Sequence, residues 1–111
     1  MHIGDDMVSK ETLTSITDCL VARFRPERII LFGSHARGTA DDRSDVDILV
    51  ISAFEGRRRK LMAEMDRALE GLELAIDIIV LTPDEFELDR QIPGTVARPA
   101  WLEGKVIYER S

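Results

Sequence analysis

Three short apolar segments constrain the fold of this chain more than any other feature. They span residues 28–33, 45–51 and 74–81, and each has the length of a buried strand. Helical patterns lie between and around them, an order typical of an α/β (α+β) layer in which helices pack on a small mixed sheet. Only eleven residues, 34–44, connect the first two segments. Because a parallel crossover needs about a dozen or more, we expect these two strands to run antiparallel.

Amphipathic patterns predict helices before, between and after these strands. Apolar side chains three or four apart predict one helix over residues 9–24 and another over 57–72. A threonine, a proline and a glutamate within 82–85 indicate the start of a third helix. Pro99 falls where a last helix would continue, so we expect only a short turn there, followed by a last strand at 105–109.

Size and composition exclude several classes of protein. The 111 residues fit a single domain, 1–111, and an apolar fraction of 44% is enough for one packed core. No apolar run approaches the roughly 20 residues needed to cross a bilayer, and the N-terminus lacks the pattern of a secretion signal. The single cysteine, Cys19, cannot form an internal disulfide, which fits a cytoplasmic protein. The net charge of −6 makes nucleic acid an unlikely ligand.

Three aspartates are candidate metal ligands. Asp45 and Asp47 lie two apart in the second strand, so both point to one face with Cα atoms about 6.5–7 Å apart, and a divalent cation would relieve their repulsion. Asp77 interrupts the third apolar segment, where an unpaired carboxylate is costly to bury. With 11 aspartates in the chain, one Asp-x-Asp arises by chance, and Asp77 alone could pair with an arginine. Together the three indicate a metal site.

A glycine and two polar residues offer a phosphate-binding turn. Gly33 allows the backbone to approach an oxyanion closely, and Ser34 offers a hydroxyl and an N–H at the start of a helical turn. Arg37 lies one turn further on, where it could reach phosphate oxygens. The alternatives are a plain helix cap at Ser34 and a surface ion pair of Arg37 with Asp41 or Asp42.

The combined pattern resembles that of a known family. The pair GS at 33–34, ten residues, then DVD at 45–47, with Asp77 on a later apolar strand, is similar to the nucleotidyltransferase fold of the DNA polymerase β superfamily. The stretch GSHARGTADDRSDVDILV and the ending EGKVIYER resemble its smallest branch, the minimal nucleotidyltransferases. The resemblance covers residues 29–110, and the combined motif is far more specific than a glycine loop alone.

The resemblance implies a mixed sheet with the active site at one rim and a mechanism that uses two Mg²⁺ ions. By position, Asp45 and Asp47 would hold both ions, and Asp77 would complete the site that activates the attacking hydroxyl. Asp77 could also accept the hydroxyl proton. Gly33 and Ser34 would cradle the β- and γ-phosphates of a nucleoside triphosphate such as ATP. The product would be a nucleotidylated acceptor, with release of pyrophosphate.

The resemblance also implies a protein partner. Larger relatives use additional domains to bind their acceptor, so we expect another chain to supply it here. Minimal nucleotidyltransferases are commonly encoded beside a helical HEPN-type ribonuclease toxin, and some act as antitoxins by adding AMP to one of its tyrosines. We expect the same of this chain, in a hetero-oligomer. Two alternatives stay open: a non-catalytic antitoxin that blocks its partner sterically, and a small-molecule nucleotidyltransferase.

Three further features have more than one interpretation. His35 lies in the connector that begins with the predicted phosphate-binding turn. We expect it to face solvent, and the alternative is contact with the nucleotide. The basic run RRRK at 57–60 is either a solvated helix start or a patch for an acidic partner or RNA. Trp101 is a candidate for either a core anchor or an interface residue.

Overall fold

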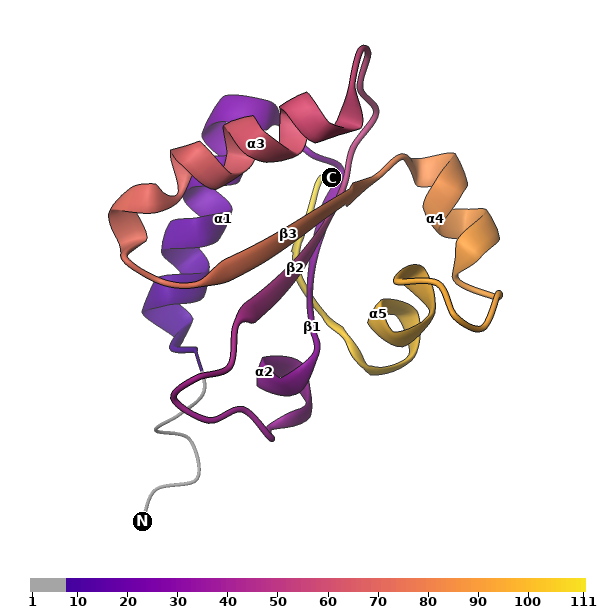
Figure 1. Ribbon diagram of the computed structural model, residues 1–111. Coiled ribbons are helices and arrows are strands. Elements are labelled where there is room, and N and C mark those ends of the chain that lie inside the picture. Colours follow the sequence, from indigo (N-terminus) through magenta and orange to yellow (C-terminus); the bar gives the residue numbers. More distant parts are fainter. Residues whose placement is uncertain (1–7) are drawn as a thin grey trace.

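The computed structural model describes residues 8–111 as a four-stranded sheet with helices on both faces (Figure 1). A short 3₁₀ turn, η1, follows the third helix. In chain order the elements are α1 (Lys10–Phe24), β1 (Arg28–Phe32), α2 (Ser34–Arg37), β2 (Val46–Ile51), α3 (Arg58–Ala68), η1 (Glu70–Leu72), β3 (Ile76–Leu81), α4 (Pro83–Asp89), α5 (Ala97–Glu103) and β4 (Lys105–Glu109).

The sheet is mixed, as predicted. Its strand order is β3-β2-β1-β4. β1 runs antiparallel to both β2 and β4, which confirms the expectation drawn from the short connector. β2 and β3 are parallel, and α3 with η1 forms the crossover between them. The end of β1 and the starts of β2 and β3 therefore meet at one rim of the sheet.

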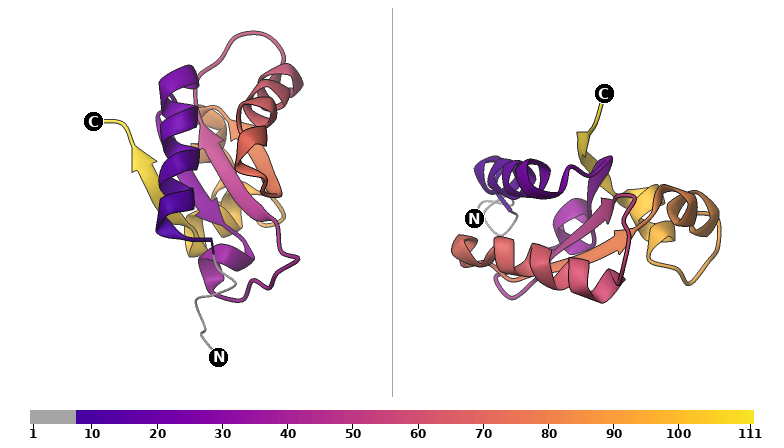
Figure 2. Two further views of the ribbon diagram at one scale, coloured as in Figure 1. Left: turned by 90° about the vertical axis from the view of Figure 1, so that its left-hand side faces the viewer. Right: turned by 90° about the horizontal axis from the view of Figure 1, so that it is seen from above.

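Helices cover both faces of the sheet, which explains why the middle of β1, β2 and β3 is apolar on both sides. α1 and α3 lie on one face, and α4 and α5 lie on the other (Figures 1 and 2). In β2, Ile48 and Val50 join the core under α1 and α3, whereas Leu49 and Ile51 join the core under α4 and α5. Successive strand residues thus belong to different cores.

The helix starts follow local sequence signals. The Ser9 side chain accepts a hydrogen bond from the amide of Thr12 at 3.1 Å and caps α1. At α4 the predicted signature forms a full capping box: Thr82 Oγ1 accepts from the Glu85 amide at 3.1 Å, and the Glu85 carboxylate accepts from the Thr82 amide at 2.8 Å. None of the helices within residues 8–111 combines the length and the apolar character needed to cross a membrane.

The structure corrects two predicted elements. The second long helix ends at Ala68 instead of residue 72, and its last turn becomes the separate η1. The tail forms a helix, α5, where only a turn was expected. Pro99 lies in the first turn of α5, where a backbone N–H has no partner within the helix, so its ring is tolerated there.

Candidate active site

The three aspartates predicted as metal ligands lie at the rim where β1 ends and β2 and β3 begin. Asp47 pairs in register with Phe32 of β1 on one side and with Asp77 of β3 on the other. Asp45 immediately precedes β2. By strand alternation Asp47 and Asp77 share the sheet face that carries α4 and α5. The parallel pairing of β2 with β3 therefore brings together carboxylates thirty residues apart in the sequence.

Gly33 is required by the close approach of Asp47. Its backbone has φ 75° and ψ −157°, a conformation that side chains rarely permit. A Cβ at this position would lie 2.1 Å from Asp47 Oδ2 and 3.0 Å from its Cγ. The glycine thus leaves the space that the Asp47 carboxylate occupies, in addition to allowing the turn into α2.

The carboxylates at this rim repel one another, which changes the pKa of Asp47. Burial raises the pKa of Asp47 above its ordinary value, and the neighbouring carboxylates of Asp77 and Asp45 raise it further. The guanidinium of Arg37 acts in the opposite direction, but burial and the two carboxylates outweigh it. A cation bound between the carboxylates would remove this repulsion.

The donor set at the rim suits a hard divalent cation such as Mg²⁺, which prefers carboxylate oxygens. Within residues 8–111, no three acidic, histidine or cysteine side chains stand close enough together to enclose one ion. Mg²⁺ is usually held by one or two carboxylates together with waters and substrate phosphates, not by a preformed protein cage. The crowded carboxylates around Asp47 therefore fit a cation that arrives with a phosphorylated ligand.

The predicted phosphate-binding residues flank the carboxylates. Ser34 is the first residue of α2, and the Gly33 carbonyl accepts from the amides of Ala36 and Arg37 at 3.1 and 3.0 Å. Arg37 is exposed, and its guanidinium lies 3.8 Å from a carboxylate oxygen of Glu103 at the end of α5. The alternative of a surface ion pair is therefore correct in kind, but its partner is Glu103 and not Asp41 or Asp42, because α5 ends beside α2.

A fourth carboxylate near this rim was missed by sequence reasoning. Burial raises the pKa of Asp66, and the charge of Asp77 adds to that effect. Asp66 lies on α3, which packs along β3. It is outside the motif and next to the buried Met65, so only the packing of α3 on β3 reveals that it is near Asp77.

The expectation that His35 faces solvent is wrong. Its side chain is only 8% exposed. Nδ1 lies 2.9 Å from the amide nitrogen of Val8, and Nε2 lies 3.2 Å from the carbonyl oxygen of Ser44. α2 presents His35 and Ala36 inward, so the imidazole fills the space between the connector and the segment before α1.

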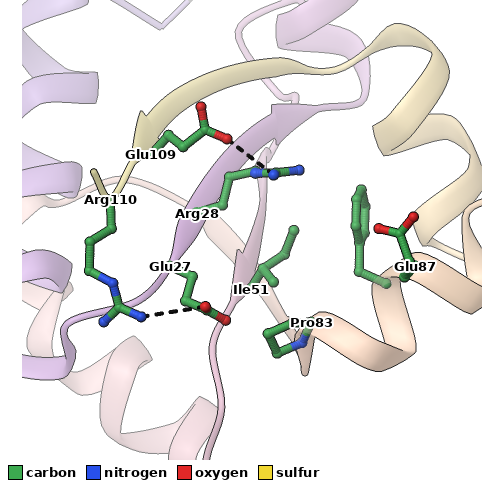
Figure 3. A pocket seen from close by; sticks show the side chains of 8 residues that line it. Glu27, Arg28, Ile51, Pro83, Glu87, Glu109 and Arg110 are labelled. Carbon is green, nitrogen blue, oxygen red and sulfur yellow. Dashed lines mark ion pairs between the residues drawn. The ribbon is translucent and has the colours of Figure 1, made fainter.

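A separate hollow of about 190 Å³ opens at the opposite end of the sheet. Figure 3 shows its charged lining, where Arg28 pairs with Glu109 at 3.1 Å and Arg110 pairs with Glu27 at 3.4 Å. These residues lie where β1 begins and β4 ends. The hollow is therefore remote from the aspartate rim, and four of its charged side chains form these two ion pairs.

The basic run at 57–60 lies toward this opposite end as well. Arg58 pairs with Glu85 of α4 at 2.6 Å, and its guanidinium lies 5.4 Å from the centre of the Phe54 ring. Arg58 therefore joins α3 to α4. Neither a solvated helix start nor a patch for an acidic partner or RNA had included this ion pair. Trp101 is 47% exposed and packs edge-on against Phe86.

Comparisons with known proteins agree with this architecture. The family model for the nucleotidyltransferase domain matches residues 13–108. No curated protein matches the chain. A protein from Sulfolobus solfataricus assigned as a nucleotidyltransferase superimposes with a TM-score of 0.62 at 26% identity, covering 88% of this chain and 78% of that one.

Two further similar structures are toxin–antitoxin complexes. One, determined with AMP-PNP, matches with a TM-score of 0.61 at 23% identity over 89% of this chain and 74% of that one. The other, a tyrosine-to-alanine variant of MntA–HpeT, gives 0.57 at 23% identity over 88% and 72% of the two chains. With the family model covering nearly all of the described residues, the chain belongs to the nucleotidyltransferase domain family, with the fold of the polymerase β-like enzymes.

Proposed function

We propose that this protein is a Mg²⁺-dependent nucleotidyltransferase that transfers AMP from ATP to a hydroxyl group of a partner protein. The proposed acceptor is a tyrosine of a HEPN-type helical toxin, which the modification would silence, so that this chain acts as the antitoxin. The observation that carries the proposal is the register of Asp47 with Asp77, with Asp45 and Gly33 beside them, in a nucleotidyltransferase fold.

Each residue at the rim has a proposed role. Asp45 and Asp47 would hold two Mg²⁺ ions, and Asp77 would complete the set of metal ligands. Gly33 and Ser34 bind the β- and γ-phosphates through the backbone and hydroxyl at the start of α2. Arg37 exchanges its exposed contact with Glu103 for a phosphate oxygen. When bound, the metal ions neutralise phosphate charge and favour loss of the hydroxyl proton.

The transfer is an in-line displacement at the α-phosphorus. The acceptor oxygen forms a bond to that phosphorus, while the bond from the phosphorus to the oxygen that bridges to the β-phosphate breaks. Pyrophosphate leaves, and the hydroxyl proton passes to the carboxylate of Asp77. Asp47, the proposed metal ligand, lies in register with Asp77, the proposed proton acceptor, so both act from the same face of the sheet.

Two lines of support extend the proposal to a protein acceptor in a hetero-oligomer. Two of the similar structures are toxin–antitoxin complexes, one of them determined with a nucleotide analogue. In addition, Asp45 and Asp77 are exposed, so an acceptor side chain of another protein can reach the rim. A cytoplasmic location fits the free thiol of Cys19, which contacts the carbonyl of Ala68 at 3.3 Å.

To test the proposed transfer, the purified protein is incubated with Mg²⁺, α-labelled ATP and the protein encoded by the adjacent gene. We expect label on the partner, a mass gain of one or more AMP units, and a tyrosine as the modified residue. Asp47→Asn should lower transfer by at least about 100-fold, because it removes a charge that holds the metal. Asp18→Asn, the same change at an exposed position on α1, should leave transfer unaltered.

Two other outcomes would contradict part of the proposed function. Neutralisation of the toxin by both Asp47→Asn and the wild type, without label on the partner, would contradict catalysis and indicate steric blocking. Label that appears on a small acceptor in the absence of the partner would contradict the protein acceptor while retaining the nucleotidyltransferase.

A further inference from the structure

The imidazole of His35 joins three segments of the site. His35 follows Ser34 in α2, its Nε2 contacts the carbonyl of Ser44 at 3.2 Å, and its Nδ1 contacts the amide of Val8 at 2.9 Å. Ser44 directly precedes Asp45, so one side chain spans the connector from the proposed phosphate-binding turn to the proposed metal ligand. At 8% exposure, His35 is one of only two buried polar side chains within residues 8–111.

The two contacts require a single arrangement of ring hydrogens. A carbonyl oxygen can only accept, so Nε2 must donate to Ser44. A backbone amide can only donate, so Nδ1 must accept from Val8. The tautomer with its hydrogen on Nε2 satisfies both partners at once. Each ring nitrogen therefore makes one hydrogen bond, and a substitution can remove either hydrogen bond without the other.

The segment that His35 holds is already a tight turn. The Asp41 carboxylate accepts from the Arg43 amide at 2.9 Å and from Ser44 Oγ at 3.1 Å, and the Ser44 amide donates to the Asp41 carbonyl at 3.1 Å. These bonds lie within residues 41–44 and do not attach them to the core. The contact from His35 to the Ser44 carbonyl supplies that attachment, and it orients the peptide group that joins Ser44 to Asp45.

We propose that His35 is a positioning residue, which sets the distance between the phosphate-binding turn at Ser34 and the metal ligand Asp45. This rests on the proposed function, since it assigns His35 a part in the same nucleotidyl transfer. His35 touches neither the nucleotide nor the metal and acts through the Ser44 carbonyl. Its Nδ1 contact with Val8 serves stability, because it secures the segment before α1.

Two conservative variants of His35 each keep one of its two hydrogen bonds and remove the other. In His35→Gln the side-chain amide can still donate to the Ser44 carbonyl but no longer accepts from Val8, whereas in His35→Asn the reverse holds. Val8→Pro removes the Val8 donor without altering the imidazole and is the matched control for His35→Gln. The readouts are affinity for Mn²⁺ in the presence of AMP-PNP, kcat and KM for ATP, and the thermal unfolding midpoint.

We expect His35→Asn to weaken Mn²⁺ affinity and lower kcat by roughly 10- to 100-fold, with little change in KM for ATP. His35→Gln and Val8→Pro should lower the unfolding midpoint but keep kcat and Mn²⁺ affinity within about threefold of the wild type. Equal losses of kcat in His35→Gln and His35→Asn, or changes that track the unfolding midpoint alone, would overturn the proposal.

A measurement independent of catalysis keeps this inference separate from the proposed function. The Val46 amide donates to the carbonyl of Ala75 at 2.9 Å, next to the segment that His35 holds. His35→Asn should speed hydrogen exchange at Val46 relative to the middle of β2, and ¹⁵N NMR of the wild type should show the Nε2–H tautomer. A wild type that binds no Mn²⁺ would overturn the proposed function, whereas unchanged exchange at Val46 would overturn the role of His35.

Discussion

At the scale of single residues, the candidate site depends on a contact between a glycine and a carboxylate. Asp47 Oδ2 occupies the space where a side chain at residue 33 would begin. The same glycine has a positive φ, which allows the chain to leave β1 and start α2 directly. One residue therefore serves both the path of the backbone and the placement of a proposed metal ligand.

Gly33→Ala tests this contact. The new Cβ should displace the Asp47 carboxylate and strain the backbone, which costs about 1–3 kcal/mol in the free energy of unfolding. Displacement of a metal ligand should also lower nucleotidyl transfer by more than roughly tenfold. The control is Gly71→Ala, where an added Cβ meets nothing within 4 Å. Urea unfolding and transfer assays measure both effects, and equal behaviour of the two variants would contradict the interpretation.

Much of this residue-level picture could be predicted from the sequence, because spacing along a strand determines which side chains share a face. This spacing predicted that Asp45 and Asp47 share a face, and Asp77 was proposed because it interrupts an apolar segment. The register of β2 with β3 places Asp77 beside Asp47. His35 and Asp66 could not be placed, since their surroundings come from elements distant in sequence. For His35 these are the segment before α1 and the turn at Ser44, neither of which has a pattern that points to an imidazole.

At the scale of elements, the strands and long helices follow their hydrophobic periodicity closely, but helix ends depend on packing. The third helix stops at Ala68 and the chain continues as η1, although the apolar stripe runs on to residue 72. The start of α4 was predictable because its capping box is local. The ion pair that joins α4 to α3 was not predictable, since only the packing of both helices on the sheet places Arg58 beside Glu85.

Glu85 should make stability depend on pH on the acid side. Hydrogen bonding to the Thr82 amide, and then the Arg58 side chain, lower its pKa below the ordinary value of 4.5. A lowered folded-state pKa means that the carboxylate contributes stability above the unfolded-state value, and that this contribution is lost as the pH falls through the folded-state value.

The variant Glu85→Gln should therefore lose stability near neutral pH and converge with the wild type below about pH 4. Because Glu85 is more than one-third exposed, solvent screening limits the difference to under about 1 kcal/mol. Urea unfolding from about pH 7 down to about pH 3 measures it. Glu64→Gln, at an exposed position on α3, should show no such convergence, and a constant difference for Glu85→Gln would exclude the charge as its cause.

At the scale of the whole molecule, the sheet separates two polar ends. At one end the ion pairs of Arg28 with Glu109 and Arg110 with Glu27 balance their own charges. At the other end the three proposed metal ligands crowd together. Asp47 and Asp77 lie side by side on neighbouring strands, and Asp45 directly precedes β2. Without these three of the 21 acidic residues the formal charge of −6 would be −3. If the proposed metal ligands bind a cation, part of the acidity of the molecule belongs to that site.

This distribution predicts that the metal and the nucleotide stabilise the fold together. At a concentration of Mg²⁺–AMP-PNP about 100-fold above its dissociation constant, binding to the folded state adds about 2.7 kcal/mol to the free energy of unfolding. In a domain of this size, that raises the unfolding midpoint by about 10 °C or more. Differential scanning calorimetry measures the shift, and NaCl at equal ionic strength is the control for simple screening of the net charge.

The double variant Asp45→Asn/Asp47→Asn should be more stable than the wild type without metal, and should gain no stability from Mg²⁺–AMP-PNP. Without metal it should unfold at a higher temperature than the wild type, because two mutually repelling carboxylates, one of them half-buried, have been removed. With Mg²⁺–AMP-PNP its unfolding midpoint should not rise, since the amide side chains cannot replace the charges that attract the cation. A metal-free variant less stable than the wild type would show that these carboxylates support the fold. An undiminished response to Mg²⁺–AMP-PNP would show that the cation binds elsewhere.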